Sequence, residues 1–394
     1  MVTVLANLAL ITVAVPAVLA SLYLLVLTLL SRRLPAPLPT NRRQQFDIIV
    51  PAHNEAGNIL QTVTSLQAVD WPAEQFRILV VADNCTDDTA SIARAAGATV
   101  LVREDPSAKG KGYALDFAFS RSRADRWAEA VVVVDADAVV SGNLLAAIAA
   151  RLEQGEQAVQ VHYGVQNPDA SWRTRLLTIA KAAFHILRSR ARERLGVSCG
   201  IRGNGWCVTH QVLAAVPYTA FSLTEDIEYG IVLGLAGIRV AYADEAHSDA
   251  EMVSGERASR TQRQRWEHGR FQLVRTKARP LLAAGLGRPS AICLDLALDL
   301  LVLPLSYVVL NILALFGLVA LAGLWNPGLS AWLWPPIACT GAVLLYVLRG
   351  WQLSGIGPRG LLDLARAPFY LLWKVVLMMR PHGSEWVRTD RERP

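Results

Sequence analysis

The stretch VVVVDADAVV, residues 131–140, decides the fold. Its four consecutive valines predict a strand over 130–137 that is buried on both faces, as in a parallel sheet. Two carboxylates, Asp135 and Asp137, follow with one residue between them, so both can approach the same cation. Such oxygens suit Mg²⁺ or Mn²⁺, which usually also takes oxygens from a substrate phosphate. The alternative interpretation is a polar turn that only ends a buried strand.

Strands and helices alternate on both sides of this stretch. Short apolar runs predict the strands, and segments with helical periodicity follow most of them. The alternation predicts an α/β fold with a mainly parallel sheet, in which ligands bind beyond the carboxyl ends of the strands. Two further carboxylates, Glu55 and Asp83, stand near such ends. The other predicted strands are 46–50, 77–83, 98–104 and 158–165.

Both ends of the chain are apolar. Residues 3–30 carry no charge and are long enough to cross about 30 Å of hydrocarbon. Residues 299–325 and 331–348 are two further apolar runs, whereas 361–379 carries charges and predicts an interfacial or re-entrant helix. We therefore expect an N-terminal transmembrane helix at 1–33, a globular domain at 45–285, and a C-terminal membrane region at 290–394 with two spans, the interfacial helix and a cytosolic tail.

Basic residues predict the orientation in the membrane. Arg32 and Arg33 follow the first span, and such charges stay in the cytoplasm. We therefore expect a multi-pass protein of the inner (cytoplasmic) membrane with its globular domain in the cytosol. The net charge of +6 is mild and lies largely beside apolar segments, which favours anionic lipid over nucleic acid as a partner. The five cysteines have neither zinc-site nor redox spacing.

Two loops and one basic stretch are candidates for ligand or membrane contact. SAKGKGYAL (107–115) places Lys111 among glycines, where its ammonium can reach a phosphate, although the P-loop pattern is absent. GIRGNG (200–205), with Gly203 and Gly205, predicts a flexible wall of a cleft. The basic stretch 172–196 fits a helix at the membrane interface, and an ordinary surface helix is the alternative.

The stretch FSLTEDIEYGIVLGLAG (221–237) predicts a helix whose start carries two carboxylates. Ser222 and Glu225 match a capping box, which gives Glu225 a structural interpretation beside a catalytic one. Asp226 has no capping duty. In a cleft beside a metal-bound substrate it can act as a general base toward a hydroxyl group.

The stretch TQRQRWEHGR (261–270) favours a solvated basic helix when it is taken alone. Its position after the acidic strand ends and before the return to the membrane favours a site instead. Gln262, Arg265 and Trp266 recur at the spacing that puts them on one helix face.

Five motifs in this order carry a family resemblance: PAHNE (51–55), VVADNCTDDT (80–89), DAD (135–137), TED (224–226) and QRQRW (262–266). The set resembles the signatures of membrane-bound family 2 glycosyltransferases. That group includes cellulose, hyaluronan, chitin and poly-N-acetylglucosamine synthases and the ceramide glucosyltransferases. The resemblance implies a GT-A fold and transfer of a sugar, in one displacement that inverts its anomeric carbon, from a UDP-sugar.

The resemblance also implies roles for individual residues. Asp226, with Glu225 beside it, deprotonates the acceptor hydroxyl. Asp135 and Asp137 hold the metal and the diphosphate. The implied donor-binding residues are Glu55, Asp83, Asp135 and Arg265, to which the 107–115 loop adds Lys111. The implied acceptor-binding residues are Gln262 and Trp266, to which the 200–205 loop adds Gly203 and Gly205.

Departures from the family pattern limit what the resemblance implies. Some synthases have a histidine just after the second metal aspartate, where this chain has Ala138. Processive synthases build a polymer channel from more helices than the three spans expected here. We therefore expect transfer to a lipid, lipid-linked or polysaccharide acceptor, with a homo-oligomer or polysaccharide-export partners left open. The alternatives are a subunit of a processive synthase, a non-catalytic membrane scaffold that binds nucleotide-sugar, and a nucleotidyltransferase.

Overall fold

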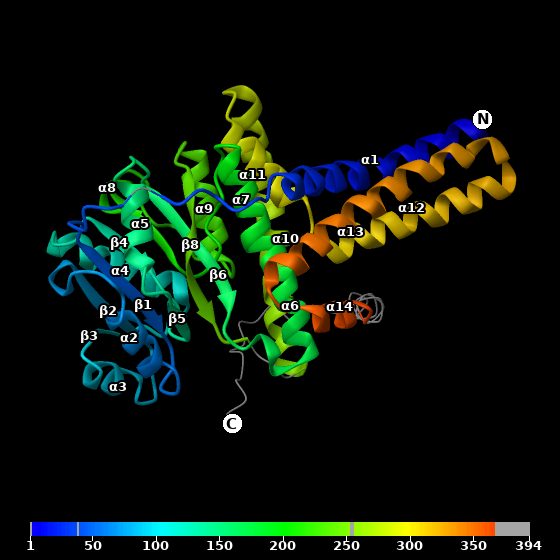
Figure 1. The fold of residues 1–394 in the computed structure, drawn as a ribbon. Coiled ribbons are helices and arrows are strands. Elements are labelled where there is room, and N and C mark those ends of the chain that lie inside the picture. The colour runs from blue at the N-terminus through cyan, green and yellow to red at the C-terminus, as the bar shows by residue number, and fades with distance from the viewer. Residues whose placement is uncertain (1, 38, 253–255, 367–394) are drawn as a thin grey trace. The chain divides into compact units, whose positions relative to one another are not determined.

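The computed structural model describes residues 2–37, 39–252 and 256–366, and of residues 2 and 256–265 it describes the backbone alone. These residues divide into two compact units (Figure 1). The sheet unit comprises 33–174 and 192–297, and the helix unit comprises 2–32, 175–191 and 298–366.

The sheet unit is built around one eight-stranded sheet with the strand order β3-β2-β1-β4-β7-β6-β8-β5. The pairs β1–β2, β1–β4 and β2–β3 are parallel, so the first half of the sheet has the predicted parallel arrangement. The strands are β1 Phe46–Ala52, β2 Phe76–Asp83, β3 Thr99–Arg103, β4 Ala130–Val133, β5 Ala138–Val140, β6 Ala158–Val165, β7 Trp206–Thr209 and β8 Val240–Ala250.

The second half of the sheet is mixed, which the sequence did not predict. β7 runs antiparallel to both β4 and β6, and β5 runs antiparallel to β8, whereas β6 and β8 are parallel. β5 and β7 were missed because they are very short, and β8 was missed because Asp, Glu, His and Ser interrupt its apolar pattern after the first four residues. The expected strand over 130–137 was too long, because β4 ends at Val133 and the chain then turns.

Helices cover both faces of the sheet, because side chains alternate between the two faces along each strand. In β1, Ile48 and Val50 join the apolar core beneath α2, α3 and α5, and Ile49 joins the core beneath α4, α8 and α9. The helices of this unit include α2 Ile59–Gln67, α3 Thr89–Ala95, α4 Lys111–Asp125, α5 Leu144–Leu152, α8 His210–Ala215, α9 Glu225–Leu235 and α10 Glu256–Gly287.

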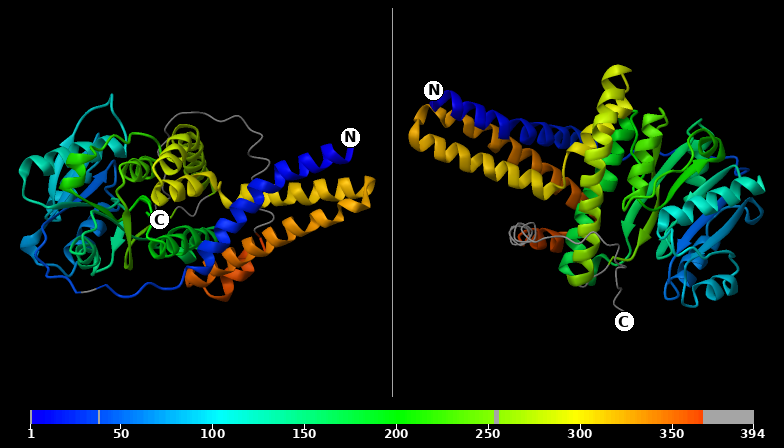
Figure 2. Two further views of the ribbon diagram at one scale, coloured as in Figure 1. Left: turned by 90° about the horizontal axis from the view of Figure 1, so that it is seen from above. Right: turned by 180° about the vertical axis from the view of Figure 1, so that it is seen from behind.

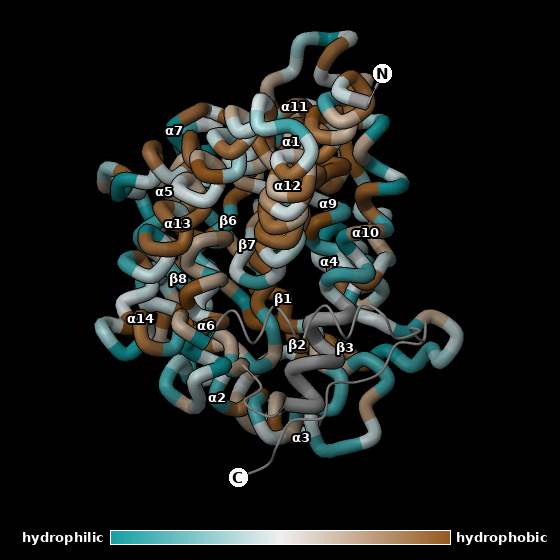
Figure 3. The backbone as a smooth tube through the Cα atoms, turned by 90° about the vertical axis from the view of Figure 1, so that its right-hand side faces the viewer, coloured by the Kyte–Doolittle hydropathy of each residue, from teal (hydrophilic) through white to brown (hydrophobic). Residues whose placement is uncertain are grey.

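The helix unit contains three helices that are long and apolar enough to cross a membrane: Thr3–Leu29, Leu305–Trp325 and Pro327–Ser354. They form α1, α12 and the helical segment that ends in α13, and these three elements lie side by side in Figure 2. Figure 3 shows α12 largely in the hydrophobic colour. The bounds are α1 Val2–Leu29, α12 Leu305–Trp325, α13 Trp334–Ser354 and α14 Pro358–Leu364.

The basic stretch 172–196 forms α6 Trp172–Lys181, a π-helical turn over Ala182–Leu187 and α7 Arg188–Arg194. Its central part belongs to the helix unit, where Ala183 and Leu187 are buried in one apolar cluster with residues of α1, α12 and α13. The surface-helix alternative is therefore wrong for this part. Of the expected interfacial helix at 361–379, the structure describes only the first residues, which belong to the end of α14, and residues 367–379 lie outside the described residues.

Candidate active site

Asp135 and Asp137 lie in the turn that joins β4 to β5. Both side chains are partly exposed, while Ala136 between them is buried in the core. The backbone N–H of Asp135 donates a hydrogen bond to the side-chain oxygen of Asn204 at 3.0 Å. The turn interpretation and the ligand interpretation are thus compatible, because the turn itself presents both carboxylates on the side away from the core.

The ammonium group of Lys111 contacts three of the predicted site carboxylates. As the first residue of α4, it lies 2.9 Å from Oδ1 of Asp135, 3.3 Å from Oδ2 of Asp226 and 3.7 Å from Oε1 of Glu225. It also donates a 2.7 Å hydrogen bond to the carbonyl of Gly203. Groups from the DAD turn, the 200–205 loop and the TED motif therefore meet at the Lys111 ammonium. We call this set the Lys111 cluster; its members are Lys111, Asp135, Gly203, Glu225 and Asp226.

The Lys111 cluster has strongly shifted acidities. Burial raises the pKa of Asp226 well above its usual range, the neighbouring Glu225 carboxylate raises it further, and Lys111 opposes both effects. Burial alone lowers the pKa of Lys111, but the Asp135, Asp226 and Glu225 carboxylates raise it well above its usual value. The lysine therefore stays charged, and Asp226 is a carboxylate that binds a proton unusually well.

Tyr163 on β6 faces the same charges. Burial raises the pKa of its phenol well above the usual value, and the Asp135 and Asp137 carboxylates raise it further. The phenol therefore remains protonated and can act as a hydrogen-bond donor. A Cβ atom on Gly203 would lie 3.3 Å from its ring and 3.7 Å from Oδ2 of Asp226, so glycine allows the close contact of these groups.

The predicted capping box at the start of α9 is wrong. The helix begins at Glu225 with Thr224 as its N-cap, and the Glu225 carboxylate faces Lys111 instead. The reciprocal bond to the backbone N–H of Ser222 comes from Glu228, one turn further on. Glu225 therefore does not have the helix-capping role that the S-x-x-E pattern predicted.

Helix α10 carries the 261–270 stretch against the start of α9. A Cβ atom on Gly269 would lie only 2.4 Å from Cγ2 of Thr224, so the two helices touch beside the TED motif. Gly269 follows Trp266 by three residues and Arg265 by four, which places these positions on one helix face. The side chains of Gln262 and Arg265 lie outside the described residues, so their predicted roles stay predictions.

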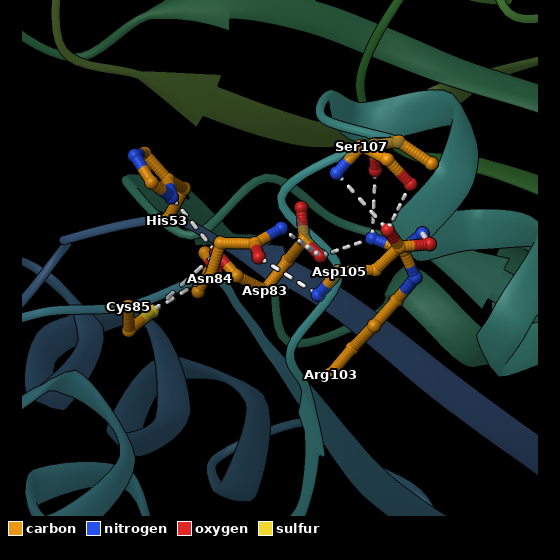
Figure 4. Close-up of polar contacts among 9 residues, drawn as sticks. His53, Asp83, Asn84, Cys85, Arg103, Asp105 and Ser107 are labelled. Carbon is orange, nitrogen blue, oxygen red and sulfur yellow. Dashed lines mark hydrogen bonds and ion pairs between the residues drawn. The ribbon is translucent and has the colours of Figure 1, made fainter.

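A second polar cluster stands at the ends of β2 and β3 (Figure 4). Asp83 is buried, and its Oδ1 accepts hydrogen bonds from Arg103 at 2.6 Å and from the side chain of Asn84 at 3.1 Å. The guanidinium of Arg103 also pairs with Asp105 at 3.1 Å and lies 5.8 Å from the ring centroid of Tyr113. These hydrogen bonds fix the Asp83 carboxylate at the end of β2, and its donor-binding role stays a prediction.

Glu55 is engaged locally. Its carboxylate accepts a hydrogen bond from Asn58 at 3.0 Å, and its backbone N–H donates to Thr89 at the start of α3 at 2.8 Å. The loop after β1 and the loop after β2 are also joined by His53, whose ring nitrogen contacts the backbone oxygen of Asp83 at 2.8 Å. Glu55 therefore lies beside the Asp83 loop, and its donor-binding role stays a prediction.

The GIRGNG loop is held firmly, which corrects the expectation of a flexible wall. The amide nitrogen of Gln160 donates to the carbonyls of Asn204 and Gly205 at 2.7 and 3.1 Å, and its oxygen accepts from the backbone of Arg202 at 2.8 Å. Gly205 has a φ of +69°, and a Cβ atom there would lie 2.5 Å from Val161. The predicted acceptor role of Gly203 and Gly205 stays a prediction.

Sequence reasoning missed four functional candidates: Arg103, Gln160, Tyr163 and Asn204. Two of them left a signal, because Arg103 lies near the end of the predicted strand 98–104 and Gln160 interrupts the apolar run AVQV. The other two are recognisable only when β6 and the 200–205 loop are brought against the DAD turn.

The fold and these clusters define the class of protein. Asp83 ends the parallel strand β2, Asp135 follows the end of β4, and the largely buried carboxylates of Glu225 and Asp226 stand at the start of α9. This sheet with its carboxylates is typical of an α/β sugar-transferase domain of the GT-A type. Residues 43–269, more than half of the chain, match the model described as glycosyltransferase like family 2. The chain belongs to this family, and the resemblance seen in its motifs is confirmed.

Curated relatives include two kinds of synthase. The beta-monoglucosyldiacylglycerol synthase of Synechocystis sp. is 29% identical over 238 residues, which cover 58% of this chain and 48% of that protein. The UDP-forming cellulose synthase catalytic subunit of Pseudomonas fluorescens is 27% identical over 274 residues, which cover 66% of this chain and 36% of that protein. The chain thus spans about half or less of the length of these relatives.

A solved structure supports the fold. The mannosyltransferase PcManGT from Pyrobaculum calidifontis, in complex with GDP-Man and Mn²⁺, aligns over 86% of this chain and 97% of its own, with a TM-score of 0.50. Its sequence identity is 19%, so the likeness concerns the fold alone. The predicted GT-A α/β architecture is confirmed.

The Lys111 cluster leads to a prediction about stability. Lys111→Met leaves three carboxylates near one another without their cation, and we expect a loss of about 3 kcal/mol of unfolding free energy near neutral pH. Removing the cation raises the folded-state pKa of Asp226 further above its unfolded value. The cost is therefore present above that pKa and fades as the pH falls through it.

Thermal unfolding of the detergent-purified protein at neutral and mildly acidic pH measures this effect. Lys109→Met is the matched control, because Lys109 lies two residues before Lys111, just outside α4, and is exposed. Equal destabilisation by both substitutions, or a loss at Lys111 that does not diminish in acid, contradicts the prediction.

Proposed function

We propose that this protein is an inverting glycosyltransferase that moves a sugar from a UDP-sugar to a lipid, lipid-linked or polysaccharide acceptor at the cytosolic face of the membrane. One observation carries the proposal: a single ammonium group, that of Lys111, contacts both Asp135 of the DAD turn and Asp226 of the TED motif. The proposed diphosphate-binding carboxylate and the proposed base therefore contact the same lysine side chain.

The proposed reaction is a single displacement. An acceptor hydroxyl gives its proton to a carboxylate oxygen of Asp226, and the hydroxyl oxygen forms a bond to the anomeric carbon of the donor sugar. The bond from that carbon to the diphosphate oxygen breaks, and its electron pair leaves with UDP. The raised pKa of Asp226 suits this role, because a base that binds its proton well provides more driving force for the transfer.

The residues present fit a divalent cation when the donor is bound. Among the described residues, no three His, Cys, Asp or Glu side chains form a metal site by themselves. Mg²⁺ is usually held by one or two carboxylates together with substrate phosphates, and the partly exposed Asp135 and Asp137 supply such a pair. Bound there, Mg²⁺ or Mn²⁺ supplies positive charge to the diphosphate. Lys111, which already contacts Asp135, adds a further positive charge beside it.

The second polar cluster, formed by Asp83, Asn84, Arg103 and Asp105, is the proposed binding site of the nucleobase. Asp83 is an acceptor-only group when ionised, so it suits a ring N–H of a base, and Arg103 holds the carboxylate in place. Lys111 lies at the end of the loop that begins at β3, so one loop connects the proposed base and diphosphate positions. This order along the chain fits a nucleoside diphosphate.

The acceptor is proposed from the helix unit and from the relatives. Among the described residues, three helices are long and apolar enough to cross a membrane, which fits an acceptor that is itself held in the bilayer. Relatives named as glucosyldiacylglycerol synthases favour a glycolipid product, and those named as cellulose synthases favour a polysaccharide. We favour transfer of one or a few sugars.

The direct test is a transfer assay with the full chain in detergent. The protein is incubated with a panel of UDP- and GDP-sugars, membrane lipids and Mg²⁺ or Mn²⁺, and the products are analysed by mass spectrometry. We expect metal-dependent release of UDP together with a product that is heavier by one or a few hexose units. Donor binding without transfer across the panel supports the scaffold alternative, and long polymers support a processive synthase.

Two substitutions separate the proposed roles of the carboxylates. Asp226→Asn is expected to reduce transfer at least 100-fold, because it removes the base, while UDP binding is retained. Asp137→Asn is expected to weaken UDP binding only in the presence of the metal. Calorimetric UDP titrations with and without Mn²⁺, beside the transfer assay, measure both effects.

The contradicting results are specific to each residue. Loss of UDP affinity in Asp226→Asn removes the assignment of the base. A metal response of Asp137→Asn equal to that of the unsubstituted protein removes the assignment of the metal ligand.

A further inference from the structure

The side chain of Asn204 lies against the backbone of Asp135 in the DAD turn, although no motif drew attention to it. It is fully buried, and its oxygen accepts hydrogen bonds from the backbone N–H of Asp135 and from the hydroxyl of Ser248, both at 3.0 Å. The DAD turn has left the sheet ladder at this point. Asn204 therefore supplies the acceptor that the Asp135 N–H no longer finds in a neighbouring strand.

Asn204 is itself held from below by a buried side chain. Gln160 on β6 donates its amide to the backbone carbonyls of Asn204 and Gly205. The N–H of Gly205 donates to the carbonyl of Val133, the last residue of β4, at 3.0 Å. The neighbouring Gly203 carbonyl receives the Lys111 ammonium. The loop 200–205 is thus held in place by hydrogen bonds, and it positions both Asp135 and Lys111.

One buried polar atom of this loop has no hydrogen-bond partner among the described residues. The amide nitrogen of Asn204 is buried and makes no hydrogen bond to any described residue. The amide orientation is set by the backbone N–H of Asp135, which requires an oxygen opposite it. A buried donor without a partner costs about 1–3 kcal/mol, and native proteins keep such groups rarely. A ligand that brings an acceptor oxygen removes that cost.

We propose that Asn204 both positions Asp135 and binds the diphosphate of the donor in the transfer reaction. Its oxygen holds Asp135 in the position that receives the cation and the diphosphate, and its unpaired amide nitrogen donates to a phosphate oxygen of the bound nucleoside diphosphate. The inference rests on the proposed function, and it adds a residue that acts on the diphosphate rather than on the base or the sugar.

Binding measurements on the full chain test the inference without relying on turnover. Asn204→Ala is titrated with UDP in the presence of Mn²⁺, and with uridine, which lacks the phosphates. We expect UDP to bind about tenfold more weakly, the factor that one lost hydrogen bond of about 1.4 kcal/mol gives, while uridine binding is unchanged. A loss that is confined to UDP places the effect at the diphosphate.

Two further variants control for general damage. Asn167→Ala also removes a side chain that makes two hydrogen bonds, to the backbone of Met252, and it is expected to leave both titrations unchanged. Asn204→Asp keeps the oxygen that accepts from Asp135 and loses the donor, so it protects the test if the alanine variant does not fold. It is expected to weaken UDP binding and to spare uridine binding.

The outcomes separate this inference from the proposed function. Asn204 variants that bind UDP as tightly as Asn167→Ala overturn the inference, as does an equal loss of UDP and uridine binding with a lowered melting temperature. If the unsubstituted protein binds no nucleoside diphosphate with Mn²⁺ and transfers no sugar, the proposed function itself fails.

Discussion

The partly buried ammonium of Lys111 makes the interactions on which the site depends. Asp135, Glu225 and Asp226 lie close enough to repel one another, and the cation at 2.9, 3.7 and 3.3 Å makes their proximity tolerable. The same contacts leave Asp226 with a raised pKa, because burial and Glu225 outweigh the lysine. Charge compensation within the fold and the raised pKa of the proposed base therefore follow from one arrangement.

The polar atoms around this cation come from backbone as well as side chains. The carbonyl of Gly203 and the side-chain oxygen of Asn204 are both offered by a loop that Gln160 fixes from beneath. A glycine-rich sequence usually indicates freedom of movement. Here the glycines serve close approach instead, since a side chain at position 205 would collide with Val161. Rigidity at this loop preserves the distance between Asp135 and the start of α9.

Much of the fold and part of the site could be predicted from residues at strand ends. Parallel strands bring their carboxyl ends to one edge, so Asp83 and Asp135 were found by pattern alone. The S-x-x-E pattern at Ser222 predicted the wrong helix cap. In the structure α9 begins at Glu225, whose carboxylate contacts Lys111, and Gly269 packs against the N-cap residue Thr224. Asn204 and Tyr163 depend on the antiparallel β7 and on β6, whose placement in the mixed half of the sheet left no local signal.

The stereochemistry of the product tests the central claim most directly. If Asp226 activates an acceptor that displaces UDP in one step, an α-linked UDP-sugar must yield a β-linked product. Nuclear magnetic resonance of the purified product reports this configuration through the coupling of the anomeric proton. The account predicts a β-linkage, and an α-linked product would contradict it.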